Sequence, residues 1–391
     1  MSFHPFEEPP TVALDSLKQW IKSQLPWTDG ITKKIVAKTW PPKSIAYYRG
    51  GYPMVTEADL REKGASGSEA AAIFLTKEWA KQGYQVTVFA RCGDREGVYD
   101  GVRYCNFNQM NWFDRFDIFV AWKHPIYLKP NVKARKAFIE WQDVNYPEAY
   151  YTPEILNRFD KIFSKSQYQR NLLPEISDDK FTFVTNGFDS EILKYADREK
   201  NRYKLVYASR YYRGLEFMLE YGWPIVKRDV PEAELHVFYG FTKADYQPER
   251  QAWREKMEGL LAQPGVIDRG MVGYNQLMEE KASSAIHYYA CTYEEVDCIS
   301  VRESSIVGCV PVTTDFAVLA EKDYCLKIPG EPKARETQEA IAYKIVELLQ
   351  NPDRLEAIRQ EFKDIALGET WENVAQVWMR EFEREETTSS R

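Results

Sequence analysis

Short apolar segments alternate with amphipathic helical segments along most of this chain, and this alternation constrains its fold more than any other feature. Between the first two apolar segments, residues Ser66 to Gly83 have helical periodicity, with Ser66 and Glu69 at capping-box spacing and Gly83 as a C-terminal stop. Strands that alternate with helices are typical of βαβ units around a mostly parallel sheet. The strand-like segments of the first half are 44–51, 84–90, 116–122, 137–142, 160–166 and 180–187.

The same alternation begins again in the second half of the chain. A polar segment, 186–202, separates the two halves and is a candidate hinge near residue 190. Two Rossmann-like domains of this kind face each other across a central cleft, and open α/β sheets bind ligands at the carboxyl ends of their strands. The later strand-like segments are 202–209, one that starts at Glu234, 265–270, 283–290 and 308–314.

The predicted fold class is therefore α/β, with two Rossmann-like domains facing a central cleft. A length of 391 residues suits two domains of ordinary size. The predicted parts are an N-terminal helical extension at 1–43, a first Rossmann-like domain at 44–190, a second at 191–370, and a C-terminal helix and tail at 371–391.

Composition excludes several classes of function. The formal net charge of −7 argues against a nucleic-acid partner, because such proteins need clustered Lys and Arg to displace counterions. No apolar run is long enough to span a membrane and the first residues lack a signal-peptide pattern, so a cytoplasmic location is expected. The six cysteines form no Cys-x-x-Cys pair, which disfavours a disulfide framework or a zinc site.

The N-terminal extension leaves two interpretations open. One is a solvated helix packed on the first domain, and the other is a weak peripheral contact with a membrane surface. The helical pattern there is followed by four lysines, Lys33, Lys34, Lys38 and Lys43.

Two arginines follow the first strand of the second domain. That strand ends at about Ala208 and the next helix starts near Gly214, so Arg210 and Arg213 lie where a helix N-terminus offers free N–H groups. This geometry suits phosphate, and arginine forms forked contacts with phosphate oxygens. The alternative is a pair of surface arginines in a loop.

A second helix N-terminus is predicted in "YEEVDCISVRES", residues 293–304. The amides of Cys298, Ile299 and Ser300 would face a diphosphate, with Glu295 before the turn and Glu303 more than one helical turn further on. A carboxylate has two acceptor oxygens and fits a vicinal diol such as ribose. The alternative is two glutamates on a solvated helix.

The chain offers few groups for acid–base or metal chemistry. Of its four histidines, His124 follows a strand and either hydrogen-bonds a donor sugar or is structural, whereas His236 and His287 lie inside predicted strands. The sequence contains no Asp-x-Asp pair, so no metal–diphosphate clamp is expected and arginines and helix dipoles would neutralise a leaving group. No metal site and no cofactor are therefore predicted.

Two segments of the second half resemble the donor domain of family 4 glycosyltransferases, which are retaining enzymes of the GT-B fold. These segments are "YASRYYRGLEFMLEYGWPIVKRDVPEAELHVFYG" and "YEEVDCISVRESSIVGCVPVTTD". In the first half, "SGSEAAAIFLTKEWAKQGYQVTVFA" resembles the family's glycine-rich turn and first helix, and "VTNGFD" its crossing between domains. The resemblance covers roughly residues 44–385 and implies an acceptor domain followed by a nucleotide-sugar donor domain.

The resemblance also implies roles for individual residues. Glu295 would contact hydroxyls of the donor sugar, Glu303 the ribose and Arg213 the phosphates. Asp143 follows Gln142 where many relatives have a His-Asp pair, and the candidate catalytic residues are Glu295, Arg213, His124 and Asp143. The remaining implied donor contacts are Ser66, Gly67 and Ser68 from the first domain, Met271 and Val272 at the base, and Arg210, Cys298, Ile299 and Ser300 at the diphosphate.

The expected function is a retaining, metal-independent transfer of a hexose-type sugar from a nucleotide-diphosphate sugar to a hydroxyl of a glycan or other acceptor. The alternatives are an isomerase similar to the nucleotide-sugar 2-epimerases and a non-catalytic nucleotide-sugar binding protein. The base, the sugar and the acceptor stay open, because backbone contacts set the choice of base. The aromatic segments 49–53 and 142–154 either stack on a glycan or pack internally.

Overall fold

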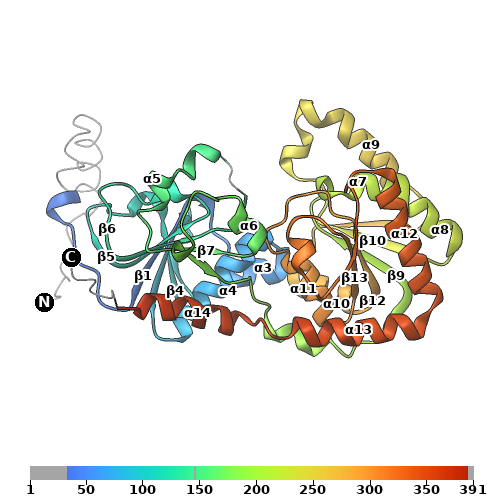
Figure 1. The fold of residues 1–391 in the computed structure, drawn as a ribbon. Coiled ribbons are helices and arrows are strands. Elements are labelled where there is room, and N and C mark those ends of the chain that lie inside the picture. Colours follow the sequence, from blue (N-terminus) through green and yellow to red (C-terminus); the bar gives the residue numbers. More distant parts are fainter. Residues whose placement is uncertain (1–32, 145–146, 386–391) are drawn as a thin grey trace, which may run out of the picture.

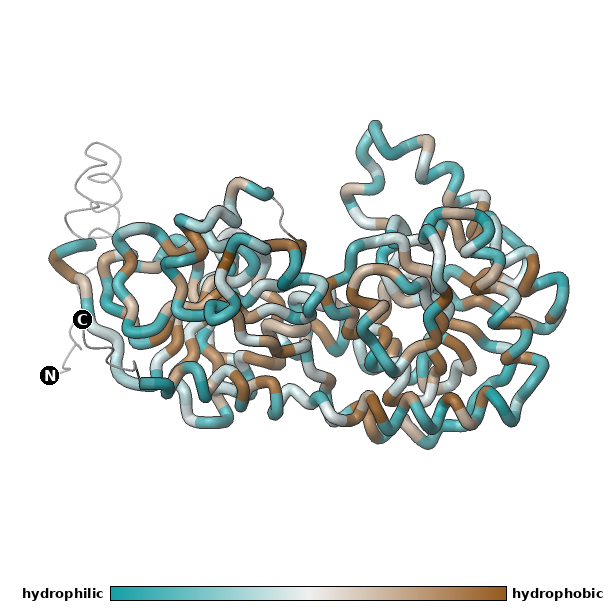
Figure 2. The backbone as a smooth tube through the Cα atoms, in the orientation of Figure 1, coloured by the Kyte–Doolittle hydropathy of each residue, from teal (hydrophilic) through white to brown (hydrophobic). Residues whose placement is uncertain are grey.

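The computed structural model describes residues 33–144 and 147–385, and Figure 1 shows two α/β domains side by side. The first 32 residues, which include the predicted N-terminal helix, and the tail after residue 385 lie outside the described residues. Hydrophobic residues gather in the interiors of both domains (Figure 2). No helix of the described ranges is both long and apolar enough to cross a membrane.

The first domain is built on an eight-stranded sheet with the order β3-β4-β2-β1-β5-β6-β7-β8. Every pairing is parallel except that of β3 with β4, a short hairpin at the edge that the sequence pattern did not reveal. The strands are β1 Ser44–Pro53, β2 Gln85–Arg91, β3 Gly97–Tyr99, β4 Val102–Asn106, β5 Arg115–Trp122, β6 Lys133–Glu140, β7 Lys161–Ser164 and β8 Phe181–Phe183. Its helices are α3 Glu57–Lys63, α4 Gly67–Lys81, α5 Pro153–Leu156 and α6 Gln167–Asn171.

The second domain is built on a six-stranded parallel sheet with the order β11-β10-β9-β12-β13-β14. The strands are β9 Asn201–Ala208, β10 Glu234–Phe238, β11 Val266–Gly270, β12 Ser284–Tyr289, β13 Val310–Thr314 and β14 Leu326–Ile328. The helices are α7 Leu215–Phe217, a π-helical turn Met218–Gly222, α8 Trp223–Asp229, α9 Gln251–Leu261, α10 Tyr274–Ala282, α11 Ile299–Ile306, α12 Arg335–Gln350 and α13 Pro352–Ala366. The two sheets confirm the predicted α/β class with two Rossmann-like domains.

The last helix, α14 Trp371–Glu383, returns to the first domain, where Figure 1 shows it beside α4. The Trp378 side chain is fully buried, and its ring lies 5.3 Å from that of Trp79. The ring of Phe382 also lies 5.3 Å from the ring of Trp79. The amphipathic pattern predicted this helix, but not that it completes the core of the N-terminal domain.

The chain thus crosses between the domains twice. The first crossing lies between Phe183 and Asn201, and the second precedes α14. The two crossings pair with each other through a parallel bridge between Phe188 and Thr370, with the Phe188 amide donating to the Glu369 carbonyl at 3.0 Å. The predicted hinge near residue 190 is therefore one of two chain segments that lie side by side between the domains.

Buried ion pairs fix the first crossing to the second domain. The Asn186 amide donates to Asp297 Oδ2 at 2.9 Å, and Asp297 also pairs with Arg302 at 3.1 Å and Lys322 at 2.6 Å. Burial alone raises the pKa of Asp297, but the two cations outweigh burial and hold its pKa below the ordinary value. Asp297 is fully buried, so it is ionised and paired inside the protein.

Helix α3 adds a direct contact between the domains. Arg61 Nη2 lies 2.8 Å from Asp189 Oδ2, and Arg61 Nη1 donates to Asn275 Oδ1 at 3.1 Å. Gly64 has a φ of 77°, and a Cβ there would lie 2.4 Å from the Val272 carbonyl oxygen. The two loops approach each other so closely that only glycine fits.

Candidate active site

A cavity of about 350 Å³ lies between the two domains, at the carboxyl ends of their parallel strands. This volume is within the range of small-molecule sites, and the position is where open α/β sheets bind ligands. Lys123 and Gln142 follow β5 and β6, and Ser209, Tyr239 and Met271 follow β9, β10 and β11. The cleft expected from the sequence is therefore present.

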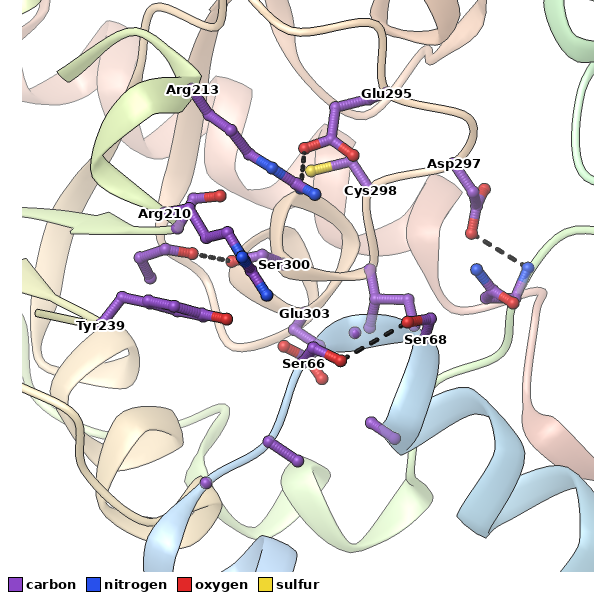
Figure 3. A pocket seen from close by; sticks show the side chains of 18 of the residues that line it. Ser66, Ser68, Arg210, Arg213, Tyr239, Glu295, Asp297, Cys298, Ser300 and Glu303 are labelled. Carbon is purple, nitrogen blue, oxygen red and sulfur yellow. Dashed lines mark hydrogen bonds and ion pairs between the residues drawn. The ribbon is translucent and has the colours of Figure 1, made fainter. Parts of the chain in front are cut away.

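Nearly all of the predicted site residues line this cavity. The exception is His124, whose neighbour Lys123 lines the cavity instead. The predicted residues in the lining are Ser66, Gly67, Ser68, Asp143, Arg210, Arg213, Met271, Val272, Glu295, Cys298, Ile299, Ser300 and Glu303. Figure 3 shows several of them converging from both domains. Their individual roles remain predictions.

Helix α11 begins at Ile299, as the sequence predicted, and points its N-terminus at the cavity. Its N-cap residue Cys298 has a left-handed φ of 61°, and no side chain caps the first turn. Uncapped N–H groups at a helix start carry partial positive charge and favour an anion.

Glu303 is held in a fixed orientation on α11. Its side chain is buried, the Tyr274 hydroxyl donates to Oε1 at 2.8 Å, and Lys281 Nζ donates to Oε2 at 3.0 Å. Lys281 is itself fully buried and also donates to the Ser300 carbonyl at 2.9 Å. The alternative of a glutamate on a solvated helix face is therefore wrong for Glu303.

Glu295 is likewise buried and forms an ion pair with Arg213. The Tyr289 hydroxyl donates to the same carboxylate oxygen at 2.6 Å. The Arg213 guanidinium lies 4.6 Å from the ring of Tyr293. Arg213 and Glu295 are thus one neutral ion pair at the cavity wall. The sequence did not predict this pair, because the two residues come from distant segments.

Arg210 differs from Arg213 in its surroundings. Among the residues that the structure describes, no carboxylate lies within ion-pair distance of Arg210. Its guanidinium instead lies 5.9 Å from the ring of Tyr212 and 5.5 Å from that of Tyr239. Arg210 is therefore the cationic side chain of this wall whose charge is not balanced by a neighbouring acid.

The first domain contributes the loop before α4. Ser66 is the N-cap residue of this helix, as predicted, and its backbone amide and hydroxyl both donate to Glu69 Oε2, at 3.0 and 2.7 Å. The helix then starts with Gly67, and a Cβ there would meet only the Ile299 Cδ1 atom, at 3.9 Å. The N-termini of α4 and α11 therefore face each other across the cavity.

Lys123 and Asp143 stand together on the first-domain side, with Lys123 Nζ 3.6 Å from Asp143 Oδ2. Burial lowers the pKa of Lys123 even though Asp143 opposes the shift. The Tyr293 hydroxyl of the second domain lies 3.5 Å from Asp143 Oδ1. Lys123 directly follows a predicted strand, so the sequence indicated its place at the end of that strand. A lysine at this place did not indicate a role in the site.

The His124 side chain packs in an aromatic cluster. Its Nε2 atom lies 2.9 Å from the Tyr52 hydroxyl, and its ring centroid lies 5.4 Å from that of Tyr127 and 6.0 Å from that of Tyr150. Burial, followed by the charge of Lys123, lowers the pKa of His124, so the imidazole is neutral near pH 7. His236 and His287 are buried in β10 and β12, as expected of structural histidines.

The described residues contain no group of three or more His, Cys, Asp or Glu side chains arranged to hold a metal ion. Three further residues at the site were not predicted from the sequence: Tyr239, Tyr274 and Lys281. Tyr239 follows a predicted strand and carried a positional signal, whereas nothing in the pattern of α10 distinguished Tyr274 or Lys281 from ordinary helix residues.

No protein-family model matches the chain, and no curated protein sequence matches it. Among solved structures, the sucrose-phosphate synthase of Thermosynechococcus elongatus is similar, with a TM-score of 0.65 and 14% identity over 86% of this chain and 97% of that one. Anabaena HepE in complex with UDP and glucose has a TM-score of 0.62 and 13% identity over 86% and 98%. WaaG, a glycosyltransferase involved in lipopolysaccharide biosynthesis, has a TM-score of 0.61 and 13% identity over 87% and 100%.

At these identities the likeness concerns the fold alone. It covers both domains and nearly the full length of each similar structure. The chain therefore has the GT-B fold, two Rossmann-like domains that face a central cleft.

Proposed function

We propose that this protein is a glycosyltransferase that moves a hexose-type sugar from a nucleotide-diphosphate sugar to a hydroxyl of a glycan or other acceptor. The observation that carries the proposal is the combination of positive and acceptor groups in one cavity. Arg210 and the uncapped start of α11 offer positive charge, while Glu295 and Glu303 offer buried carboxylates on either side of it. The similar structure of HepE, which holds UDP and glucose, supports this class of ligand.

The proposed donor lies along the second-domain wall. The diphosphate binds the amides of Cys298, Ile299 and Ser300 together with Arg210, and a ribose hydroxyl pair binds Glu303. Charge-assisted hydrogen bonds of this kind contribute about 1.5–3 kcal/mol each. Glu303 keeps the capacity to accept them because each carboxylate oxygen has two acceptor lone pairs and receives one bond from the protein.

The proposed reaction retains the anomeric configuration and needs no metal ion. The bond between the anomeric carbon and the diphosphate oxygen breaks while the acceptor hydroxyl attacks the same face, and the hydroxyl proton passes to the departing phosphate. Arg210 and the α11 amides stabilise the negative charge that develops on the leaving group. Glu295, held by Arg213 and Tyr289, orients the sugar hydroxyls, and the domains exclude water when they close.

The acceptor is proposed to enter from the first-domain side, where Lys123 and Asp143 line the cavity. The aromatic cluster of Tyr52, Tyr127 and Tyr150 surrounds His124, the residue after Lys123, and has the flat faces on which sugar rings stack.

The test is an activity assay with a panel of nucleotide sugars in the presence of EDTA. We expect slow donor hydrolysis without an acceptor, transfer with one, and a product whose anomeric configuration by NMR matches that of the donor. An inverted linkage would remove the retaining mechanism. Epimerisation of the sugar at C2 without release of the nucleotide would instead indicate an isomerase.

A further inference from the structure

Tyr239 has the most unusual backbone conformation of the non-glycine residues that the structure describes. Its φ is 103°, whereas the other five non-glycine residues with positive φ, Lys43, Asp100, Lys123, Cys298 and Ala317, lie between 52° and 63°. Those values belong to the left-handed helical region, which side chains can enter at modest cost, but 103° lies beyond it. A bulky residue in such a conformation is strained, and strain of this kind clusters at ligand sites.

The strand register holds Tyr239 in this conformation. Phe238 pairs with Gly270 across β10 and β11, and the Tyr239 amide donates to the Gly270 carbonyl at 2.9 Å. Gly240 follows with a φ of 75°, so the chain turns away from the sheet directly after the ring. The backbone is therefore fixed by the sheet and not by packing of the Tyr239 side chain, which is only half-buried.

The strained backbone directs the phenol ring into the cavity. Figure 3 shows the ring extending from the end of its strand beneath Arg210, towards Ser66 and Glu303. The Arg210 guanidinium lies 5.5 Å from the ring centre, and the loop of Met271 and Val272 starts one residue after the carbonyl that the Tyr239 amide contacts. Tyr239 thus has its ring beside Arg210 and its backbone beside that loop.

We propose that Tyr239 is a specificity-determining residue whose ring packs against the base of the bound nucleotide. This inference rests on the proposed function and assigns one further residue to the same site. A nucleobase has a π-face that stacks on an aromatic ring, and this contact contributes to affinity independently of the phosphates. Strained backbone of this kind clusters at ligand sites, and the ring that it carries faces the cavity.

The strain makes a prediction that a packing residue would not make. In Tyr239→Gly the φ of 103° becomes an ordinary conformation while the ring is lost. Stability and affinity should therefore separate: the melting temperature stays at or above that of the wild type, whereas nucleotide affinity falls. Stacking on a single aromatic ring corresponds to about a 5- to 100-fold change in Kd.

The experiment compares wild type, Tyr239→Gly and Tyr239→Phe by calorimetric titration with UDP, GDP, ADP and inorganic pyrophosphate, and by thermal unfolding. We expect Tyr239→Gly to bind the preferred nucleotide about 5- to 100-fold more weakly, to bind pyrophosphate as the wild type does, and to unfold at no lower temperature. Tyr239→Phe should keep the nucleotide affinity within about threefold, because it keeps the ring.

Three results would overturn the inference while the proposed function stands. They are unchanged nucleotide affinity in Tyr239→Gly, an equal loss for pyrophosphate, and a loss in Tyr239→Phe as large as that in Tyr239→Gly. A wild type that binds none of the nucleotides would overturn the proposed function itself, together with this inference.

Discussion

Removal of the Glu303 side chain should destabilise the second domain, and this loss of stability must be separated from any effect on ligand binding. Lys281 is fully buried, and in the described part of the chain Glu303 is its only ion-pair partner, at 3.0 Å. Glu303→Ala leaves the ammonium group buried without a counter-charge. Breaking a buried pair from one side costs about 3–5 kcal/mol. For a domain of this size that corresponds to a fall in Tm on the order of 10 °C.

The matched variant removes both charges at once. In Lys281→Met with Glu303→Gln the volumes are nearly conserved, no charge is left unpaired, and the Tyr274 hydroxyl keeps an acceptor. Replacement of a buried ion pair by neutral groups is often close to neutral, so we expect the double variant to recover to within about 1–2 kcal/mol of wild type. Denaturant unfolding of Lys281→Met, Glu303→Gln and the double variant gives the coupling energy directly.

This cycle also separates stability from recognition. A double variant that is folded but has lost nucleotide affinity supports a ribose contact by the Glu303 carboxylate. The reasoning is refuted if Glu303→Ala unfolds at the wild-type temperature, or if the double variant is as unstable as the sum of the single ones.

Three further predictions follow from the domain contacts. The pKa of Asp297 is lowered on folding, so its ion pairs stabilise the protein above about pH 4 and lose this effect as pH falls further; Asp297→Asn should be about 3–5 kcal/mol less stable at pH 7 and show a flatter acid dependence in unfolding titrations. Trp378→Ala should cost about 3–5 kcal/mol in the unfolding of the first domain, and a cost below about 1 kcal/mol would contradict the burial of α14. Gly64→Ala should prevent the contact with Val272 and widen the cleft, measurable as a larger radius of gyration by small-angle scattering; an unchanged radius would count against that contact.

Most of the fold could be predicted from local patterns in the sequence. The capping box at Ser66, the start of α11 at Ile299 and most strands of both sheets could be predicted because each depends on residues close together in sequence. Strands β3, β4 and β14 have three to five residues each and were not predicted, and most of their side chains are exposed or only partly buried. The amphipathic face of α14 was visible, but a hydrophobic stripe does not say which domain covers it.

The rest of the site depends on contacts between residues far apart in the sequence, and these contacts could not be predicted. The pairing of Arg213 with Glu295, and the lack of an acidic neighbour for Arg210, could not be predicted because Arg213 and Glu295 are 82 residues apart in the sequence. Lys281 likewise holds Glu303 from a different helix. The strain at Tyr239 arises from the register of β10 with β11, which no single segment encodes.

The most direct test of the central claim is calorimetric titration of UDP, GDP and ADP, in EDTA, into the wild type, Arg210→Ala and Arg228→Ala. Arg228 lies on α8, outside the cavity, and controls for the loss of one positive charge. We predict that one nucleotide binds the wild type and Arg228→Ala equally and binds Arg210→Ala about 10- to 100-fold more weakly. Absence of binding to the wild type, or equal affinity in the two variants, would contradict the account.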